Sequence, residues 1–287
     1  MFEQTVHTWL YGEMELSKIA KRLCGIGAEG LELGIQKDGL YAPQKLLKRD
    51  ILTTVSDYGL KIPSTMALFS ADGLDLSHSD HATRMNTVEF TKRCIDVTAS
   101  IGCDRLQIVP SHISNNCSYH TTRCDDWSRA VDSIRMLGEY AAGRAVMLMI
   151  EPINRYRVAL VRTVNEALHM IRDIDLPNIH IAADVFHMQM EEPFGIAQAL
   201  RITGVHAKCV HLGDNTRYPP GLGTIDWKPI ILALRDIEYD GPLAHEPMFI
   251  DIDTYKMAND EAYAASFDRK LQYGIAYIHD IMQACCI

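Results

Sequence analysis

The sequence has no excess of positive charge and no long apolar run. Its 28 Lys and Arg residues are outnumbered by 37 Asp and Glu residues, which gives a formal charge of −9 at pH 7. Proteins that bind nucleic acids or anionic membrane surfaces obtain much of their affinity from Lys and Arg. No apolar stretch reaches the roughly 18 residues that indicate a membrane-spanning helix. We therefore expect neither nucleic acid nor membrane among the partners.

Regular cysteine pairing and a secretory leader are also missing. The eight cysteines follow no regular interval, unlike the framework of a disulfide-stabilised domain. The first residues, MFEQTVHTWLYGEMEL, lack the basic segment followed by an apolar segment that marks a signal peptide. These observations predict a cytoplasmic protein with reduced thiols.

Linkers, low-complexity segments and a Gly-rich first turn are absent as well. The missing Gly-rich turn disfavours a doubly wound sheet that binds a dinucleotide. Barrels of the α/β class with about 250 residues commonly form one domain. We therefore expect residues 1–287 to fold as a single domain.

One alternation of short apolar runs and longer amphipathic segments repeats eight times along the chain. Between the short runs, the apolar residues have helical spacing, as in 43–60, where Leu46, Leu47, Ile51, Leu52 and Val55 would share one face. Eight strands that alternate with eight helices predict a (β/α)8 TIM barrel of the α/β class. The predicted strands are Thr5–Leu10, Gly30–Gly34, Lys61–Leu68, Arg105–Pro110, Val146–Ile153, His180–Asp184, His206–Leu212 and Pro242–Glu246.

Four of these strands end on a residue type that binds metals, namely Glu151, Asp184, His211 and Glu246. Their spacings of 33, 27 and 35 residues each match about one strand-plus-helix unit. The carboxyl ends of barrel strands meet at one mouth, so the four side chains should converge there. Carboxylates suit Mg²⁺ or Mn²⁺, and one imidazole shifts the preference toward Mn²⁺, Co²⁺ or Zn²⁺. We expect one divalent ion, with Mn²⁺ preferred and Mg²⁺ or Co²⁺ as alternatives.

The second half of the chain resembles a known family. The segments EPINRYR (151–157), DVFHMQMEE (184–192), HLGDNTRYPPGLGTIDW (211–227) and HEP (245–247) look like motifs of the xylose-isomerase-like barrel enzymes, and among them of the ketose 3-epimerases. The first half matches the family only in its alternation of predicted strands and helices. The resemblance implies a small keto-sugar substrate and a homodimer or homotetramer.

The resemblance also implies roles for individual residues. The residues that match Glu151, Asp184, His211 and Glu246 hold one divalent ion in the family, usually manganese. The two that match Glu151 and Glu246 also move protons. His187 matches a histidine that contacts the sugar near its reacting oxygens, and Arg217 matches an arginine that holds a substrate hydroxyl or carbonyl.

Arg157 departs from the family pattern, which typically has Glu at this position. A guanidinium reverses the charge and suits a carboxylate or phosphate, so the residue favours a keto-sugar acid, a phosphorylated ketose or a larger oxidised glycoside. A solvent-facing or subunit-facing Arg157 remains the alternative.

Further expectations concern the pocket. Trp9, Met66, His7 and Phe69 are candidate pocket walls, Glu32 is a candidate for the barrel mouth, His245 is expected to be structural, and Gly221 and Gly223 are expected to shape a loop.

The predicted reaction begins with removal of a proton next to a ketone. A cation that binds the carbonyl and the neighbouring hydroxyl would stabilise the enediolate, and two glutamates would exchange protons with it. The sequence leaves epimerisation and aldose–ketose isomerisation open. It also leaves open a lyase that releases an aglycone from a 3-oxo-glycoside and works with a small β-rich subunit. The acidic composition disfavours an endonuclease, and the two intact glutamates disfavour a catalytically inactive sugar-binding protein.

Overall fold

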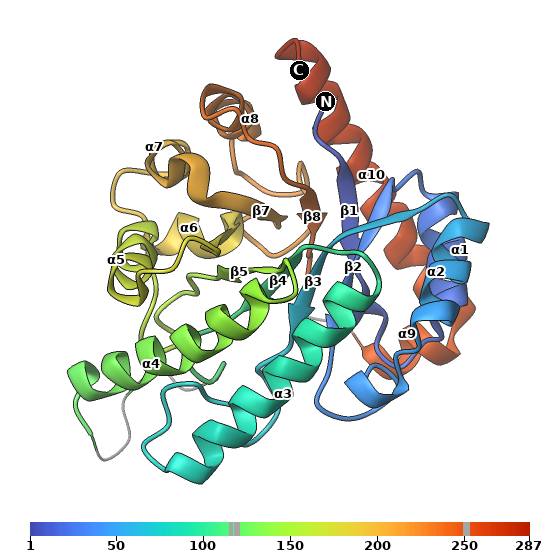
Figure 1. Cartoon of the computed structure of the whole chain (residues 1–287). Coiled ribbons are helices and arrows are strands. Elements are labelled where there is room, and N and C mark those ends of the chain that lie inside the picture. The colour runs from blue at the N-terminus through green and yellow to red at the C-terminus, as the bar shows by residue number, and fades with distance from the viewer. Residues whose placement is uncertain (115–116, 118–120, 249–252) are drawn as a thin grey trace.

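The computed structural model describes residues 1–114, 117, 121–248 and 253–287. Eight parallel strands pair in sequence order, and β8 pairs with β1, so the sheet closes into a barrel. The predicted (β/α)8 TIM barrel is therefore confirmed, with helices around the strands (Figure 1). The strands are β1 (Gln4–His7), β2 (Gly30–Ile35), β3 (Lys61–Ala67), β4 (Arg105–Ile108), β5 (Met147–Ile150), β6 (Ile179–Asp184), β7 (Ala207–Leu212) and β8 (Leu243–His245).

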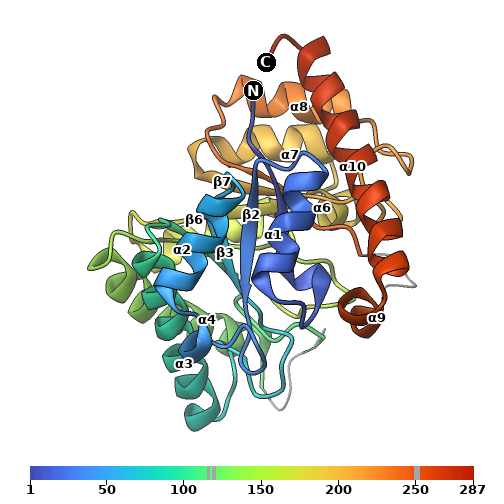
Figure 2. The ribbon, with the colours of Figure 1, turned by 90° about the vertical axis from the view of Figure 1, so that its right-hand side faces the viewer.

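The outer helices follow the strands, with two additional short helices. The helices are α1 (Leu16–Gly25), α2 (Lys48–Asp57), α3 (His81–Ser100), α4 (Arg123–Ala142), α5 (Val164–Ile174), α6 (Val185–Glu191), α7 (Ile196–Thr203), α8 (Trp227–Asp236), α9 (Thr254–Asn259) and α10 (Glu261–Ala284). Short α6 and α9 were not expected from the sequence. Short 3-10 turns lie at Thr8–Tyr11, Pro43–Lys45 and Gly204–His206. In Figure 2, α10 runs beside α1, and the two chain ends lie near each other.

The expected apolar face of the second helical segment was partly wrong. Ile51 and Val55 are buried, but Leu47 is 58% exposed and Leu52 is 36% exposed. For Leu47 the reason is the starting point of the helix, because α2 begins only at Lys48, with Leu47 in an extended conformation as its N-cap. This start leaves Leu47 outside the helical face that packs on the barrel.

The four expected metal ligands form one layer of side chains that point into the barrel. Directly below them, a small separate cluster fills the barrel interior with Met149, Ala182, Cys209 and Ala244. Each of these residues lies two positions before one of the expected ligands. Because side chains two positions apart on a strand point to the same side, the ligands form the next layer toward the carboxyl ends of the strands.

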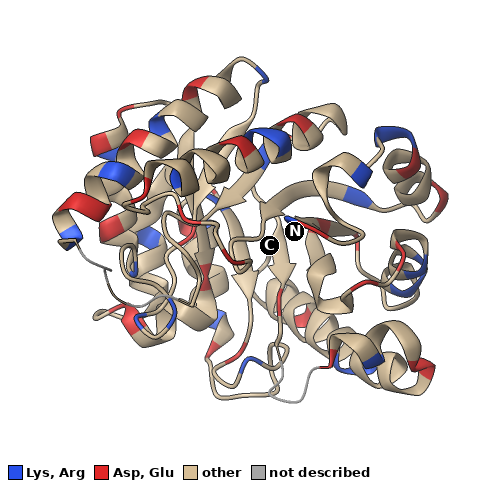
Figure 3. Cartoon of the chain, turned by 90° about the horizontal axis from the view of Figure 1, so that it is seen from below, with Lys and Arg blue, Asp and Glu red and all other residues tan. Residues whose placement is uncertain are grey.

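The outer surface carries charges of both signs. Lys and Arg segments are interspersed with Asp and Glu segments on the helices seen in Figure 3. Among the described residues, no helix combines the length and the apolar character needed to cross a membrane.

Candidate active site

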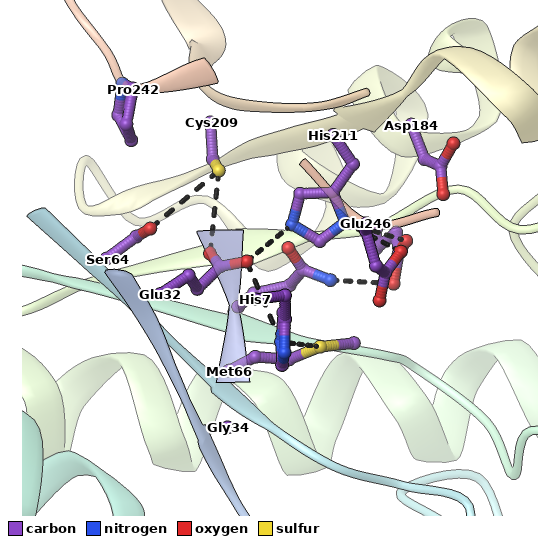
Figure 4. A network of polar contacts seen from close by, with 12 residues as sticks. His7, Glu32, Gly34, Ser64, Met66, Asp184, Cys209, His211, Pro242 and Glu246 are labelled. Carbon is purple, nitrogen blue, oxygen red and sulfur yellow. Dashed lines mark hydrogen bonds and ion pairs between the residues drawn. The ribbon is translucent and has the colours of Figure 1, made fainter. Parts of the chain in front are cut away.

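The four expected metal ligands converge at the mouth of the barrel. One ligand atom from each of Glu151, Asp184, His211 and Glu246 lies within 4.8 Å of the others, and all four residues are buried. Figure 4 shows three of them, Asp184, His211 and Glu246, gathered above the strands. Three carboxylates and one imidazole at this spacing match the oxygen and nitrogen ligands of a hard divalent cation. The donor set therefore fits a metal centre.

Neighbouring side chains hold one oxygen of each glutamate. Gln107 Nε2 donates to Glu151 Oε2 at 2.7 Å, and Trp9 Nε1 donates to Glu246 Oε1 at 2.8 Å. The opposite oxygens face His211, whose Nδ1 lies 3.2 Å from Glu246 Oε2 and 3.8 Å from Glu151 Oε1. Each glutamate thus has one anchored oxygen and one oxygen directed into the cluster.

Glu32 lies behind His211, on the side away from the other carboxylates (Figure 4). Its Oε2 is 2.8 Å from His211 Nε2, and both side chains are buried. Cys209 Sγ donates to Glu32 Oε1 at 3.6 Å, and His7 Nε2 lies 3.7 Å from Glu32 Oε2. A carboxylate on Nε2 fixes the ring orientation and keeps the proton on that nitrogen, so Nδ1 is directed toward the cluster. Glu32 therefore supports the barrel mouth from below.

Burial and charge set the protonation of this pair. Burial acts to lower the pKa of His211, but Glu32 and Glu246 outweigh burial and raise it well above its usual range. Burial acts to raise the pKa of Glu32, but His211 and His7 lower it below its ordinary value. Each of the two groups therefore stabilises the charged form of the other.

Arg217 supplies positive charge at the centre of the site. Its Nη1 lies 2.7 Å from Asp184 Oδ2, and its Nη2 lies 3.1 Å from Glu246 Oε2. The guanidinium also stacks over the Phe186 ring, with 4.4 Å between the guanidinium carbon and the ring centroid. The sequence predicted that Arg217 contacts substrate, but it did not predict these bonds to two of the candidate ligands.

The loop that carries Arg217 is held by one buried carboxylate. Asp214 accepts hydrogen bonds from the backbone nitrogens of Asn215, Ile225 and Gly221, and from Trp227 Nε1. Gly221 has a φ of +83°, and a Cβ on Gly223 would lie 2.1 Å from Asp214 Oδ1. The expectation that the two glycines shape this loop is confirmed.

His187 is placed by the start of α6. Asp184 caps this helix, since its Oδ1 accepts from the backbone nitrogens of Phe186 at 2.7 Å and His187 at 3.3 Å. Asn154 Nδ2 donates to His187 Nδ1 at 2.8 Å, and His187 Nε2 lies 3.6 Å from Asp184 Oδ2. Burial lowers the pKa of His187 to about 4. The imidazole is therefore neutral at pH 7, with its proton on Nε2.

The two glutamates differ in their affinity for protons. Burial raises the pKa of Glu151 well above its ordinary value, although His211 opposes the shift. Burial acts to raise the pKa of Glu246 as well, but the charges of His211 and Arg217 hold it well below its ordinary range. Burial and neighbouring charges thus shift the pKa of the two glutamates in opposite directions, which is an arrangement used by acid–base pairs.

A cavity of about 900 Å³ opens over this cluster. Glu151 and Glu246 line it, whereas Asp184 and His211 are not among the lining residues. All five residues proposed from the sequence as substrate contacts lie in the cavity wall, namely Trp9, Met66, Arg157, His187 and Arg217. The position of Arg157 is notable because its Nε is buried and has no hydrogen-bond partner among the described residues.

Other pocket expectations were wrong or lie partly outside the described residues. Phe69 is fully buried in the main core, and neither it nor His7 lines the cavity. His245 faces away from the site, since its Nε2 lies 2.9 Å from Gln4 Oε1, as expected for a structural residue. The sequence also predicts that the loop 110–126 influences substrate choice, and part of this loop lies outside the described residues.

Sequence reasoning missed two residues of the site, Gln107 and Asn154. Gln107 is a polar residue between Leu106 and Ile108 in β4, and it lies fully buried beside Glu151. Strands of a parallel barrel are usually apolar throughout, so a central amide was a usable signal. Asn154 follows β5 in a loop and had no comparable signal.

The fold agrees with the comparison to known families. The family model described as the xylose isomerase-like TIM barrel matches residues 20–268. This chain belongs to the xylose isomerase-like TIM barrel family.

Among its relatives are sugar epimerases. The chain is 25% identical over 270 residues to D-psicose 3-epimerase of Agrobacterium fabrum, which covers 91% of this chain and 90% of the relative. It is 30% identical over 218 residues to 3-dehydro-D-guloside 4-epimerase of Escherichia coli K12, with 73% and 81% covered. The crystal structure of D-psicose 3-epimerase with D-tagatose from Clostridium cellulolyticum H10 shares the fold, with a TM-score of 0.84, 21% identity and coverage of 98% and 99%. The relatives support an isomerase or epimerase.

Proposed function

We propose that this chain is a divalent-metal-dependent keto-sugar epimerase in which Glu151 and Glu246 exchange protons with the substrate. The observation that carries the proposal is the buried cluster with ligand atoms within 4.8 Å of one another, two of whose carboxylates also line the cavity. The epimerase activities named for the relatives support the same assignment.

The residues that would hold the cation are Glu151, Asp184, His211 and Glu246. The bound cation would polarise the substrate carbonyl and its neighbouring hydroxyl, with Mn²⁺ as our first choice and Mg²⁺ or Co²⁺ as alternatives. Neutral His187 would donate a hydrogen bond to a sugar oxygen from Nε2, and Arg217 would neutralise negative charge that develops on the substrate.

The proton transfers follow from the two anchored glutamates. One carboxylate takes the proton from the carbon beside the ketone, which leaves an enediolate. The other carboxyl group returns a proton to the opposite face of that carbon, and the two roles exchange in the reverse direction. Gln107 and Trp9 would keep each reacting oxygen in place by holding the other oxygen of its carboxylate.

The proposed activity covers inversion at either the third or the fourth carbon of the sugar. The relatives include both 3-epimerases and a 4-epimerase, so the substrate range extends from free ketoses to oxidised glycosides. Isomerisation of the same enediolate and aglycone elimination by a lyase have no observation in their favour. The cytoplasmic location, the homodimer or homotetramer, and the β-rich partner of a lyase remain predictions from the sequence.

The test is hydrogen exchange in deuterium oxide, followed by NMR spectroscopy. The Mn²⁺-loaded protein should place deuterium on the carbon beside the ketone of D-fructose or of methyl 3-dehydro-β-D-glucopyranoside. Treatment with a chelator should stop the exchange, and renewed Mn²⁺ should restore it. Absence of exchange with every keto-sugar in the presence of Mn²⁺ contradicts the proposal.

Two matched substitutions test the glutamates. Glu151→Gln and Glu246→Gln should each abolish exchange, because an amide keeps the size of the side chain but cannot accept the substrate proton. Glu139→Gln, at an exposed position of α4, is the control and should exchange at the wild-type rate. Exchange at the wild-type rate in both active-site variants would exclude these residues as proton carriers.

A further inference from the structure

We propose that the outer part of the cavity is a second subsite, which binds a ring-shaped substituent joined to the keto-sugar by a glycosidic bond. The inference rests on the proposed function and names its substrate class. The subsite is formed by Tyr156, Arg157 and Tyr255, which we call the outer subsite. All three residues line the same cavity as Glu151 and Glu246.

The two tyrosines are largely exposed although they belong to the cavity wall. Tyr156 is 71% exposed and Tyr255 is 76% exposed. Large rings left open to water at a pocket rim are typical of ligand-binding sites. A tyrosine offers a flat apolar face with little loss of conformational freedom, so it suits stacking against another ring.

The backbone under both rings is fixed. Tyr156 donates its backbone N–H to Asn154 Oδ1 at 3.0 Å, and Asn154 also bonds to His187. Tyr255 lies in the first turn of α9, which Asp253 caps by accepting from the backbone nitrogen of Lys256 at 3.0 Å. The Tyr156 segment is thus tied through Asn154 to His187, and the Tyr255 segment is ordered by its own helix cap.

The short helix α9 forms one wall of the outer subsite. Thr254, Tyr255, Ala258 and Asn259 all line the cavity, and their spacing places them along one side of the helix. The helix approaches the turn after β1 closely, because a Cβ on Gly12 would lie 2.8 Å from Thr254 Cβ. This approach holds α9 over the barrel mouth.

The cavity is larger than a free ketose requires. Its volume of about 900 Å³ lies near the upper end of the range, about 300–1,000 Å³, that is typical of pockets for drug-sized ligands. A single sugar ring at Glu151 and Glu246 would leave the region beside the tyrosines unfilled. Arg157 also lines this cavity, and its guanidinium supplies hydrogen-bond donors for a hydroxyl or ring oxygen of the substituent.

The experiment compares two substrates that differ only in the substituent. Methyl 3-dehydro-β-D-glucopyranoside and its phenyl counterpart are assayed by deuterium exchange with the Mn²⁺-loaded protein. We expect a higher kcat/KM for the phenyl glycoside. Tyr156→Ala and Tyr255→Ala should each lower kcat/KM for the phenyl glycoside about 2- to 10-fold and leave the methyl glycoside unchanged. Tyr156→Phe and Tyr255→Phe should retain the preference because they keep the ring.

The control is Phe194→Ala, since Phe194 is 76% exposed and does not line the cavity. This variant should keep the wild-type preference for the phenyl glycoside. Equal kcat/KM values for the two glycosides in the wild-type protein would overturn the outer subsite. Equal losses for both glycosides in the tyrosine variants would overturn it as well.

A separate binding measurement distinguishes failure of the subsite from failure of the proposed function. Absence of exchange with both glycosides and with D-fructose would refute the epimerase and leave the subsite to be tested by titration calorimetry with unreactive methyl and phenyl β-D-glucopyranoside. Tighter binding of the phenyl compound, lost in the double variant of Tyr156 and Tyr255 to Ala, would then support the subsite. Equal Kd values for the two compounds would refute it.

Discussion

Replacement of Glu32 by Gln tests how the barrel supports its metal ligands. The substitution preserves the volume of a fully buried side chain but removes the charge that lies 2.8 Å from His211 Nε2. Loss of a carboxylate partner from a metal-binding histidine typically weakens metal affinity about 10- to 100-fold. An amide nitrogen directed at His211 would also favour the tautomer with its proton on Nδ1, the nitrogen that faces the other ligands. We therefore expect the variant to bind Mn²⁺ 10- to 100-fold more weakly.

The loss can be measured as a change in thermal stability. A 10- to 100-fold loss of affinity corresponds to about 1.4–2.8 kcal/mol. A change of 1 kcal/mol shifts Tm by about 2–4 °C in domains of 150–250 residues. The rise in Tm caused by a fixed, saturating Mn²⁺ concentration should therefore be smaller by about 3–11 °C in the Glu32→Gln variant.

A comparison of Tm with chelator and with Mn²⁺ separates positioning from general stability. If Glu32 only stabilises the fold, the variant will lose Tm equally under both conditions, and the increment due to Mn²⁺ will be unchanged. Cys209→Ser is a suitable control, because Cys209 is another close contact of Glu32 and a serine hydroxyl can also donate to it. The control should keep the wild-type increment. An unchanged increment in Glu32→Gln refutes the reasoning.

Two further predictions concern substrate charge and pH. Arg157→Glu should shift kcat/KM at least tenfold from an acidic keto-sugar toward neutral ketohexoses, since a partly desolvated charged hydrogen bond is worth about 1.5–3 kcal/mol. Unchanged relative specificity in a paired assay would remove Arg157 from the substrate contacts. Stability should fall as the pH drops below about 6.5, where histidines in the unfolded chain take up protons. In the folded chain, burial lowers the pKa of His7 to about 4 and that of His245 to about 3, so both stay neutral and the unfolded state binds more protons. His245→Asn, which does not titrate, should reduce the loss of Tm between pH 7 and pH 5, and an equal loss in both proteins would contradict this account.

The barrel was predictable because the alternation of apolar strands and amphipathic helices involves many residues along the whole chain. Each strand is a short apolar run, and the carboxyl ends of parallel strands must share one mouth, so the convergence of Glu151, Asp184, His211 and Glu246 follows from topology. Errors arose where one residue at an element boundary decided the outcome. Leu47 matched the apolar spacing but lies outside the helix that begins at Lys48.

The contacts around the ligands were not predictable for a different reason. Trp9 and Glu246 are separated by 237 residues, and Gln107 and Glu151 by 44. Such pairs depend on side-chain direction after the barrel has closed, which spacing along the chain does not encode. The interaction of Arg217 with Asp184 also depends on a loop conformation with a φ of +63° at Arg217, and no sequence motif specified that conformation.

The separation between strand ends and surrounding loops has a consequence for how this protein can evolve. The four candidate ligands lie at the ends of strands that hydrogen-bond around the closed barrel, whereas Tyr156 and Tyr255 lie on a loop and a short outer helix. Substitutions at such exposed positions usually change stability by no more than about 0.5 kcal/mol. A library of variants at the outer positions could therefore change which sugars bind, with little effect on the stability of the fold. The proton-transfer groups would stay unaltered. One inherited reaction can in this way be redirected to a succession of substrates.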